Sequence, residues 1–384
     1  MPDSIRLTVL SDLCFGFVHS QPDSAMYYWR LQDQLARKMA IPRYTANALN
    51  DLAIVQYYKG QYSEALINNK RALEIRRQLG DKKLLMSSLN KIGLIYQELG
   101  NYEQATSYHL QVLQLATELN VPENVSVTLN NLSYVCQHMR QYQLARQYSH
   151  RQLAMARDAA DTFQMGVACS ALQGIADAES QQDSSRYFGE AAYRYFSRVD
   201  ATLEMAAASN DLGLFYRRIQ RNDSAIMWYR RAWQLASEAG ADGDARFYAA
   251  NIGSAFVDRL QLDSARHYLS LVQAGLGKDT KPMVLKTLYG ALNTYFLLKD
   301  QHDSAIRYME LYTDVLDTIY SSQIAAQAHE LLARYNADKM EQQVSLLDKQ
   351  NQIQQLQIRS RNMIIAVILV LGALAAGILW LVWQ

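Results

Sequence analysis

The pattern of small and apolar positions along this chain repeats every 40 residues. A small residue returns eight times at this interval, and a second series three residues later is aromatic in seven of eight cases. The small series is Ala25, Ala65, Ala105, Ala145, Ser185, Ala225, Ala265 and Ala305, and the second is Tyr28, Asn68, Tyr108, Tyr148, Phe188, Trp228, Tyr268 and Tyr308. A fixed period of about 20 to 50 residues is typical of stacked repeats. We expect the rings to fill the interior of each unit and the small residues to lie where two helices approach closely.

Each unit contains two helical stretches. Apolar side chains spaced by three and four residues, as in NDLGLFYRR and NKIGLIYQELGNYEQA, predict amphipathic helices. A second helix is expected to begin beside the small residue, with the Asp-Ser pairs at 23–24, 183–184, 223–224, 263–264 and 303–304 capping its free N–H groups. The sequence thus predicts an all-α solenoid over residues 1–320, made of about eight helix–turn–helix repeats: 3–41, 42–81, 82–121, 122–161, 162–201, 202–241, 242–281 and 282–320.

A polar position recurs on the first helix of several units. It is occupied by Asn50, Asn90, Asn130 and Asn210. In register on one helix face, these amides would form a row along the inner, concave wall. A primary amide both donates and accepts hydrogen bonds, so it can hold the peptide groups of an extended segment without reading its side chains. We therefore take the row as a candidate peptide-binding groove. The other interpretation is that each amide bonds the neighbouring repeat, or is simply solvated.

One segment carries a family resemblance. With Gly93, Tyr96, Gly100, Tyr102 and Ala105, it resembles the tetratricopeptide repeat, and the likeness spans about residues 3–320. The usual period is about 34 residues, so this chain is more similar to the longer repeats of kinesin light chains. The resemblance implies a right-handed superhelix that binds a peptide or protein in its concave groove. The turn glycine of the family is replaced in four repeats, by Ser20, Arg140, Ser180 and Asp300.

The chain changes character after the repeats. Residues 321–362 lack Pro and Gly and predict a long juxtamembrane helix. An inner stripe with alternating spacings of four and three residues runs through Met340, Val344, Leu347, Asn351, Gln354 and Ile358. This spacing suits a short coiled coil, and an inner Asn favours a dimer in register. A homodimer through residues 321–362 and a single helix that caps the solenoid are both compatible with the pattern.

Residues 363–383 form an uncharged stretch of 21 residues, MIIAVILVLGALAAGILWLVW. About 20 apolar residues suffice to cross a bilayer, so we predict one transmembrane helix and a single-pass, C-terminal anchor. Lys349, Arg359 and Arg361 precede this stretch and only Gln384 follows it. By the positive-inside rule, this asymmetry places the repeats in the cytoplasm.

A second resemblance concerns the order of these parts. Repeats followed by the helix ARYNADKMEQQVSLLDKQNQIQQLQIRSRN and one membrane span are similar to the sensor halves of Bacteroidetes membrane regulators. In that family the repeats lie in the periplasm, and a histidine kinase or a helix-turn-helix transcription regulator follows the span. Two functions are therefore expected: a membrane-anchored scaffold or receptor for a protein or peptide, or the sensor region of a signal-transduction regulator whose output domain is absent from this chain.

Composition and motifs narrow the classes of function. A formal net charge of +1 offers no basic stripe for nucleic acid. The cysteines Cys14, Cys136 and Cys169 are scattered and are interpreted as buried thiols. The chain has no phosphate loop, no Cys/His cluster with metal spacing and no plausible nucleophile–base pair. We therefore expect no enzyme activity, no cofactor, no metal site and no nucleic-acid partner.

Overall fold

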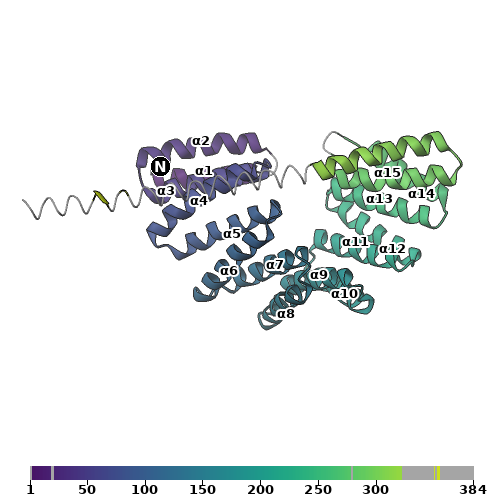
Figure 1. Ribbon diagram of the computed structural model, residues 1–384, viewed down its shortest axis with the longest axis horizontal. Helices are drawn as coiled ribbons and strands as arrows, with labels where there is room; N and C mark the ends of the chain where they lie inside the picture. The colour runs from purple at the N-terminus through teal and green to yellow at the C-terminus, as the bar shows by residue number, and fades with distance from the viewer. Residues whose placement is uncertain (1, 19–20, 278–279, 322–349, 351–352, 355–384) are drawn as a thin grey trace, which may run out of the picture. The chain divides into compact units, whose positions relative to one another are not determined.

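The computed structural model describes residues 2–18, 21–277, 280–321, 350 and 353–354. The chain divides into two compact units, Met1–Glu330 and Leu331–Gln384, and the description below concerns the first. Its described residues form helices and turns, without a strand, which confirms the all-α prediction (Figure 1). The predicted juxtamembrane helix at 321–362 lies almost wholly outside the described residues, and the predicted span at 363–383 lies entirely outside them.

Helices of nearly equal length follow one another along the chain. They are α1 (Asp3–Phe17), α2 (Pro22–Met39), α3 (Pro42–Tyr58), α4 (Tyr62–Leu79), α5 (Lys82–Glu98), α6 (Tyr102–Glu118), α7 (Pro122–His138), α8 (Tyr142–Asp158), α9 (Thr162–Ala178), α10 (Gln182–Ser197), α11 (Thr202–Arg218), α12 (Asn222–Glu238), α13 (Asp242–Asp258), α14 (Leu262–Ala274) and α15 (Pro282–Leu298). A further helical stretch is described from 302 to 321. We call the odd-numbered helices first helices and the even-numbered ones second helices.

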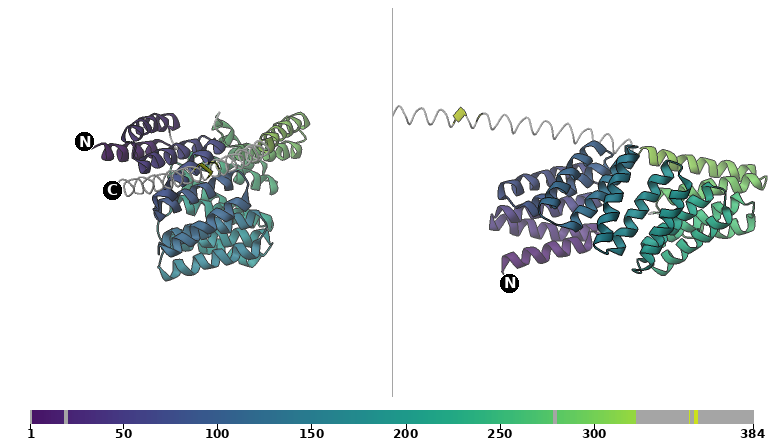
Figure 2. Two further views of the ribbon diagram at one scale, coloured as in Figure 1. Left: turned by 60° about the vertical axis from the view of Figure 1, so that its left-hand side comes forward. Right: turned by 90° about the horizontal axis from the view of Figure 1, so that it is seen from below.

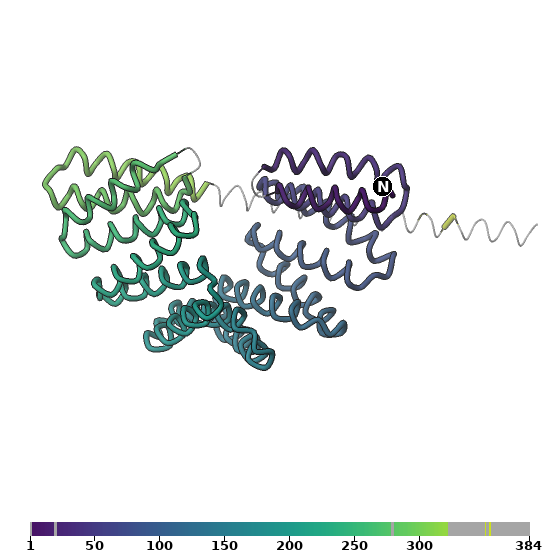
Figure 3. The backbone as a smooth tube through the Cα atoms, turned by 180° about the vertical axis from the view of Figure 1, so that it is seen from behind, coloured from purple at the N-terminus to yellow at the C-terminus, as the bar shows by residue number. Residues whose placement is uncertain are grey.

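Packing is between neighbours. Each helix packs on the next one in the chain, and first helices also contact each other, as in α1 with α3, α7 with α9 and α13 with α15. Figures 1 and 3 show this order from opposite sides, and Figure 2 shows the same stacking from two further directions. The first helices therefore form one layer of the stack and the second helices the other, which is a solenoid arrangement.

The turns share one backbone conformation. A residue with positive φ stands at every twentieth position from Ala40 to Leu260, and again at Asp300. The residue after it usually donates a backbone hydrogen bond to the carbonyl five positions back, as Gln61 does to Gln56 at 2.8 Å. This bond closes the end of a helix in a Schellman motif, where glycine is normally preferred. Here nine of the positions are not glycine, including Arg140, Ser180 and Asp300.

The Asp-Ser pairs do not cap the second helices, so that prediction was wrong. α2, α10, α12 and α14 have Gln or Arg as their N-cap residues, and none of these side chains accepts a capping bond. The turn needs only three residues, so each helix begins before the aspartate and places it in the first turn. There its charge still favours the helix N-terminus through the helix dipole. Side-chain caps occur instead at Asp81, Asn101 and Asp161.

The small series lies at the closest contacts of the stack. All eight of its members are buried, with at most 1% of their surface exposed. The aromatic series lies further out than predicted, because its rings are only half-buried. Four of them stack on a ring of the preceding first helix, at centroid distances of 5.4 to 5.8 Å: Tyr28 on Phe17, Tyr108 on Tyr96, Tyr268 on Phe256 and Tyr308 on Phe296.

In four helix pairs a large residue faces a small one sixteen positions away, whereas in α7 and α8 the equivalent positions are two hydrogen-bonded serines, Ser133 and Ser149. A Cβ on Gly213 would lie 2.5 Å from the Tyr229 ring, and one on Gly93 would lie 2.7 Å from the His109 ring. Gly253 faces Leu269 in the same way. In α9 and α10 the sizes are reversed, because Gly189 on the second helix faces Gln173 on the first. Either helix of a pair can therefore supply the large side chain.

The turn residues generate a first prediction. Leu260 has φ of 60° and is 68% exposed, so its side chain contributes strain and little burial. Leu260→Gly should stabilise the chain by about 0.5 to 1 kcal/mol, because relief of the left-handed strain exceeds the entropy that glycine adds to the unfolded chain. The matched variant is Gly240→Leu, at φ of 68° with open space around its Cβ. It should destabilise by a similar amount. Urea unfolding followed by circular dichroism measures both, and a lower midpoint for Leu260→Gly would contradict the strain argument.

The buried His109 generates a second prediction. Both ring nitrogens lack a hydrogen-bond partner among the described residues, and burial lowers the pKa of the ring from 6.5 to about 4. His109 therefore binds a proton more readily in the unfolded chain than in the folded one. As pH drops from 6.5 to 4, the contribution of His109 to the stability of the folded chain consequently falls. The loss is of the order of 3 kcal/mol at most.

His109→Leu should remove this part of the pH dependence. Leucine is the residue that already faces a glycine in the Gly253–Leu269 pair, so it is expected to fit beside Gly93. Denaturant unfolding at several pH values, compared between the two chains, measures the difference. Parallel stability–pH curves for the two chains would mean that the ring is not held neutral by burial.

Candidate functional site

The four asparagines of the candidate groove lie on the first helices α3, α5, α7 and α11. Three of them bridge neighbouring first helices through their side-chain oxygen. Asn50 Oδ1 accepts from Lys91 Nζ at 2.7 Å, Asn90 Oδ1 from Asn131 Nδ2 at 3.4 Å, and Asn210 Oδ1 from Asn251 Nδ2 at 2.8 Å. In each case the donor stands 41 residues later, on the next first helix. These oxygens therefore link one repeat to the next.

Asn130 differs from the other three. The residue 41 positions later is Ala171, which has no donor, and Asn130 has no side-chain hydrogen-bond partner among the described residues. Its side chain is half-buried, whereas Asn50 and Asn210 are only 4% and 6% exposed. Asn50 and Asn210 also use their Nδ2 groups, on Asp51 at 2.9 Å and Asp211 at 3.4 Å. Of the row, Asn130 thus keeps the most hydrogen-bonding capacity for a ligand.

The position after each asparagine also carries polar chemistry, and it was not singled out from the sequence. It is occupied by Asp51, Lys91, Asn131 and Asp211, and the equivalent position on α13, after Ala250, is occupied by Asn251. The signal was present, because these residues follow the same 40-residue period on the same helices. They supply the hydrogen-bond partners of the asparagines. The row is therefore a double row of polar side chains.

Asp51 is the centre of the polar cluster at the N-terminal end. Its Oδ2 accepts from Ser11 Oγ on α1 at 2.6 Å and from Gln32 Nε2 on α2 at 2.7 Å. Its Oδ1 accepts from Asn50 Nδ2. One carboxylate therefore connects α1, α2 and α3.

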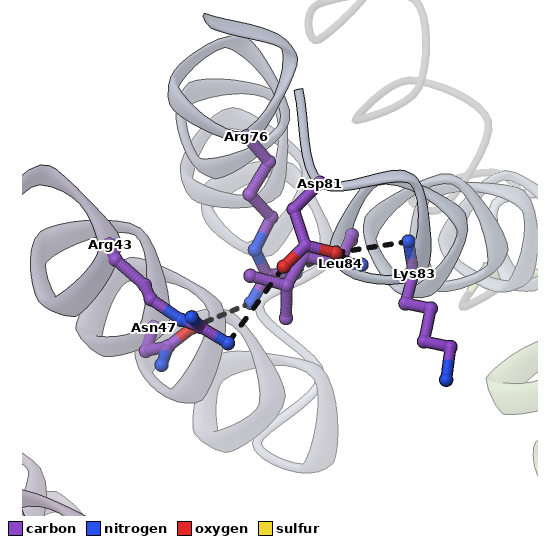
Figure 4. Close-up of polar contacts among 6 residues, drawn as sticks. All are labelled: Arg43, Asn47, Arg76, Asp81, Lys83 and Leu84. Carbon is purple, nitrogen blue, oxygen red and sulfur yellow. Dashed lines mark hydrogen bonds and ion pairs between the residues drawn. The ribbon is translucent and has the colours of Figure 1, made fainter. Parts of the chain in front are cut away.

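Arg76 on α4 lies near this cluster, and Figure 4 shows its contact with Asn47. It is 3% exposed, and its guanidinium donates to uncharged oxygens: Ser88 Oγ at 2.7 Å, Leu84 O at 3.2 Å and Asn47 Oδ1 at 3.0 Å. Burial lowers its pKa, while the charges of Asp51 and Asp81 act in the opposite direction. Figure 4 also shows Asp81 between Arg43, 3.8 Å away, and the backbone N–H of Lys83.

Lys91 brings a second cation to the cluster. Burial lowers its pKa to about 8, and the charge of Arg76 acts in the same direction, while Asp51 opposes both. The cations Arg76 and Lys91 thus lie near the carboxylates of Asp51 and Asp81 at this end of the row. Hydrogen bonds hold these polar groups in fixed positions.

A pocket of about 190 Å³ opens beside Lys91, between α1, α3, α4 and α5. Its walls are mostly apolar and aromatic, and among the described residues that line it Lys91 alone carries a charge. Phe15 and Tyr58 on its wall are 58% and 44% exposed. Such a pocket can take an apolar side chain while the polar row beside it holds a backbone.

A second polar stretch lies on α9, α11 and α13. Burial raises the pKa of Asp211 to about 6, with the nearby charge of Asp177 acting in the same direction and the Asn210 hydrogen bond opposing it. Arg217 Nε lies 2.6 Å from Asp258 Oδ2, and Arg218 Nη2 lies 2.9 Å from Asp177 Oδ2. Here the acids and bases form ion pairs between first helices of neighbouring repeats.

Other chemistry is sparse in the described part of the chain. The three cysteines are buried, and burial raises the pKa of Cys14 to about 12 and that of Cys169 to about 11. Within residues 2–18, 21–277 and 280–321, no His, Cys, Asp and Glu side chains are grouped to hold a metal ion. Among the described helices, none combines the length and apolarity of a membrane span.

Comparison with known proteins agrees with a stack of helix pairs. Residues 45–79 and residues 84–158 each match a family model for the tetratricopeptide repeat. No curated protein matches the chain.

Three solved structures illustrate the likeness in fold. The apo form of the quorum sensor NprR from B. thuringiensis has a TM-score of 0.61 at 13% identity, over 82% of this chain and 87% of that one. A signal-transduction ATPase with a tetratricopeptide repeat sensor from Pyrococcus horikoshii has a TM-score of 0.60 at 13% identity, over 83% of this chain and 49% of that one. A Rap protein complexed with competence and sporulation factor has a TM-score of 0.54 at 12% identity, over 84% of this chain and all of that one.

At these low sequence identities, the solved structures show a similar fold and nothing more. The family models identify the repeats themselves, in the part of the chain where Gly93, Tyr96, Gly100, Tyr102 and Ala105 stand. The helix pairs on either side repeat the same packing. This chain is a tetratricopeptide repeat protein, as its sequence motif predicted.

Proposed function

We propose that the repeats bind an extended peptide segment of a partner protein along the layer of first helices, as a membrane-anchored scaffold or receptor. The pocket beside Lys91 carries this proposal, because it places apolar walls next to a row of fixed polar groups on α3, α5 and α7. Tetratricopeptide repeats are protein–protein interaction modules, and a side-chain pocket beside backbone-binding amides suits an extended chain.

The similar structures support a peptide ligand. The Rap protein is complexed with competence and sporulation factor, and NprR is a quorum sensor. In this chain, Asn130 is the amide with capacity to hold a peptide group, and exposed Tyr134 stands one helical turn further along α7.

The membrane anchor in this proposal is the stretch at 363–383. It is uncharged over 21 residues and follows a segment with the basic residues Lys349, Arg359 and Arg361. Repeats in the cytoplasm and repeats in the periplasm are both compatible with such an anchor.

The alternative proposal is the sensor region of a transmembrane regulator, either a histidine kinase or a transcription regulator. It is favoured by residues 321–362, which stand between repeats and span and carry the stripe expected of a dimeric coiled coil. A homodimer through this segment would couple a ligand-dependent change in the repeats to the membrane. The Pyrococcus ATPase, whose tetratricopeptide repeats form a sensor, gives this alternative a precedent in fold.

The asparagine row generates a prediction that separates binding from structure. A heptapeptide selected from a random phage-displayed library for binding to the full chain serves as probe. Asn130→Ala should weaken binding of this peptide about fivefold, because a hydrogen bond to the ligand is lost. The stability of the chain should not change, because no hydrogen bond within the chain is lost. Asn50→Ala should instead destabilise the chain by about 1 to 3 kcal/mol, because Lys91 loses its acceptor.

Asn124→Ala is the matched control on the same helix, since Asn124 is exposed. Titration calorimetry and urea unfolding provide the two readouts. Selected peptides whose affinity is indifferent to Asn130 in every case would argue against a ligand along the first helices.

The anchor generates a further prediction. Replacing Leu369 and Leu371 by arginine should release the chain from membranes, because each central arginine costs roughly 2.5 to 3.5 kcal/mol on the insertion scale. The measurement is the fraction of chain that resists alkaline carbonate extraction. Ser→Ala at residues 345 and 360, outside the stretch, is the control. Complete extraction of the unmodified chain would refute the anchor.

A further inference from the structure

Glu98 stands at a point where several tyrosines converge. It is the last residue of α5, and its side chain is exposed. Tyr57 on α3 stands 41 residues before Glu98, the spacing at which neighbouring first helices contact each other in Asn50–Lys91 and Arg217–Asp258. Burial raises the pKa of Tyr57, Tyr62, Tyr102 and Tyr134, and the negative charge of Glu98 acts in the same direction. These rings come from α3, α4, α6 and α7, and Glu98 comes from α5. Three successive first helices, α3, α5 and α7, therefore contribute side chains to this region.

The rings around Glu98 hold each other in position. Tyr57 and Tyr62 meet edge to face with centroids 5.5 Å apart. Tyr102 stacks on His138 at 4.9 Å, and Tyr134 lies 4.3 Å from the same imidazole. Burial lowers the pKa of His138, so this ring is neutral at neutral pH. These ring–ring contacts fix the tyrosines that stand near Glu98 in the repeat register.

Two later repeats have an ion pair at or beside the equivalent positions. In the 40-residue register, Tyr57 and Glu98 correspond to Arg217 and Asp258, which form an ion pair at 2.6 Å. Asp177, on the same edge of α9, is paired with Arg218. Within residues 2–18, 21–277 and 280–321, no lysine, arginine or histidine nitrogen forms an ion pair with Glu98. A tyrosine therefore stands where the later repeat supplies its own cation.

The site continues into the pocket beside Lys91. Tyr57 lines that pocket together with Phe15, Ile54 and Leu94. The Tyr57 ring thus lines an apolar pocket of about 190 Å³ and also stands near the exposed carboxylate of Glu98. Two neighbouring side chains of a single bound segment could reach both.

We infer that Glu98 and its tyrosines form a subsite for a lysine or arginine side chain, and that the pocket takes an apolar side chain next to it in the partner. The carboxylate supplies a charge-assisted hydrogen bond, and tyrosine faces attract an ammonium or guanidinium group. This inference rests on the proposed function, because it names the sequence class of the segment that the first helices bind: a basic residue beside an apolar one.

The test compares two blocked peptides, acetyl-Gly-Leu-Arg-Gly-amide and its citrulline analogue, which is neutral and nearly the same shape. Each is titrated into the full chain in detergent micelles, and binding is followed by saturation-transfer NMR. The arginine peptide should bind about tenfold more tightly, as expected for a charged partner. Glu98→Gln should reduce its affinity to that of the citrulline peptide without changing the thermal unfolding midpoint.

Two further variants make the outcome specific. Tyr57→Arg reproduces the Arg217–Asp258 ion pair at the position of Glu98. The new guanidinium should neutralise Glu98 and so abolish the preference of the chain for the arginine peptide. Asp258→Asn removes an acid that is already paired, and should leave peptide binding unchanged.

Equal affinity for the two peptides, undetectable binding of the arginine peptide, or indifference to Glu98→Gln would overturn the inference. Phage-selected peptides that depend on Asn130 but not on Glu98 would overturn it alone and leave the proposed function in place. Selected peptides that depend on neither residue would overturn both.

Discussion

Close approach of the two helices in each pair is the constraint on which the solenoid depends. Two backbones can approach this closely only where one of them has almost no side chain, so alanine or serine stands at the contact in all eight repeats. In four of the pairs a second contact, sixteen residues apart, is filled by one large side chain facing one small one, as in Gly213–Tyr229 and the reversed Gln173–Gly189. Close packing at these contacts holds successive helix pairs at a regular spacing.

That regular spacing determines where the polar side chains meet. Neighbouring first helices are aligned so that a residue faces the one 41 positions later, which brings Asn50 to Lys91, Asn210 to Asn251 and Arg217 to Asp258. The geometry is the same in each case, but the chemistry differs between repeats. Ion pairs join helices along the whole stack, as in Lys82–Glu118 and Arg217–Asp258, whereas Glu98 forms no ion pair among the described residues and Asn130 keeps a hydrogen-bonding amide. Capacity for a ligand is thus concentrated in the earlier repeats.

The period alone was enough to predict the helix pairs and the buried small positions. Ala105 and its equivalents were found because packing acts on every repeat in the same way. The caps were predicted wrongly, because the conformation of Gln220 or Leu260 in the turn, and not the Asp-Ser pair, decides where a helix begins. The half-buried rings were placed too deep, since periodicity shows that positions are equivalent without showing how far each lies from the centre.

The polar cluster was harder to predict for a related reason. Arg76, Asp51 and Lys91 come from three helices and occur together in one place only, so no repetition marks them. Similarly, Glu98 looks like an ordinary charged residue at a helix end until its position is compared with that of Asp258. Functional differences within a repeat protein arise where one unit departs from the others. Such departures have no period, and their meaning depends on which side chains the fold brings together.

The uniform turns have a consequence for how this architecture can change in length. Since a residue with positive φ stands at every twentieth position from Ala40 to Leu260, a segment of 40 residues can be duplicated or lost with every remaining turn kept in place. Loss of 20 residues would instead reverse the direction of all later helices and expose their buried faces. Growth and shrinkage are therefore restricted to whole helix pairs. A lengthened descendant would keep the N-terminal pocket unchanged and could acquire a different ligand-binding surface further along the stack.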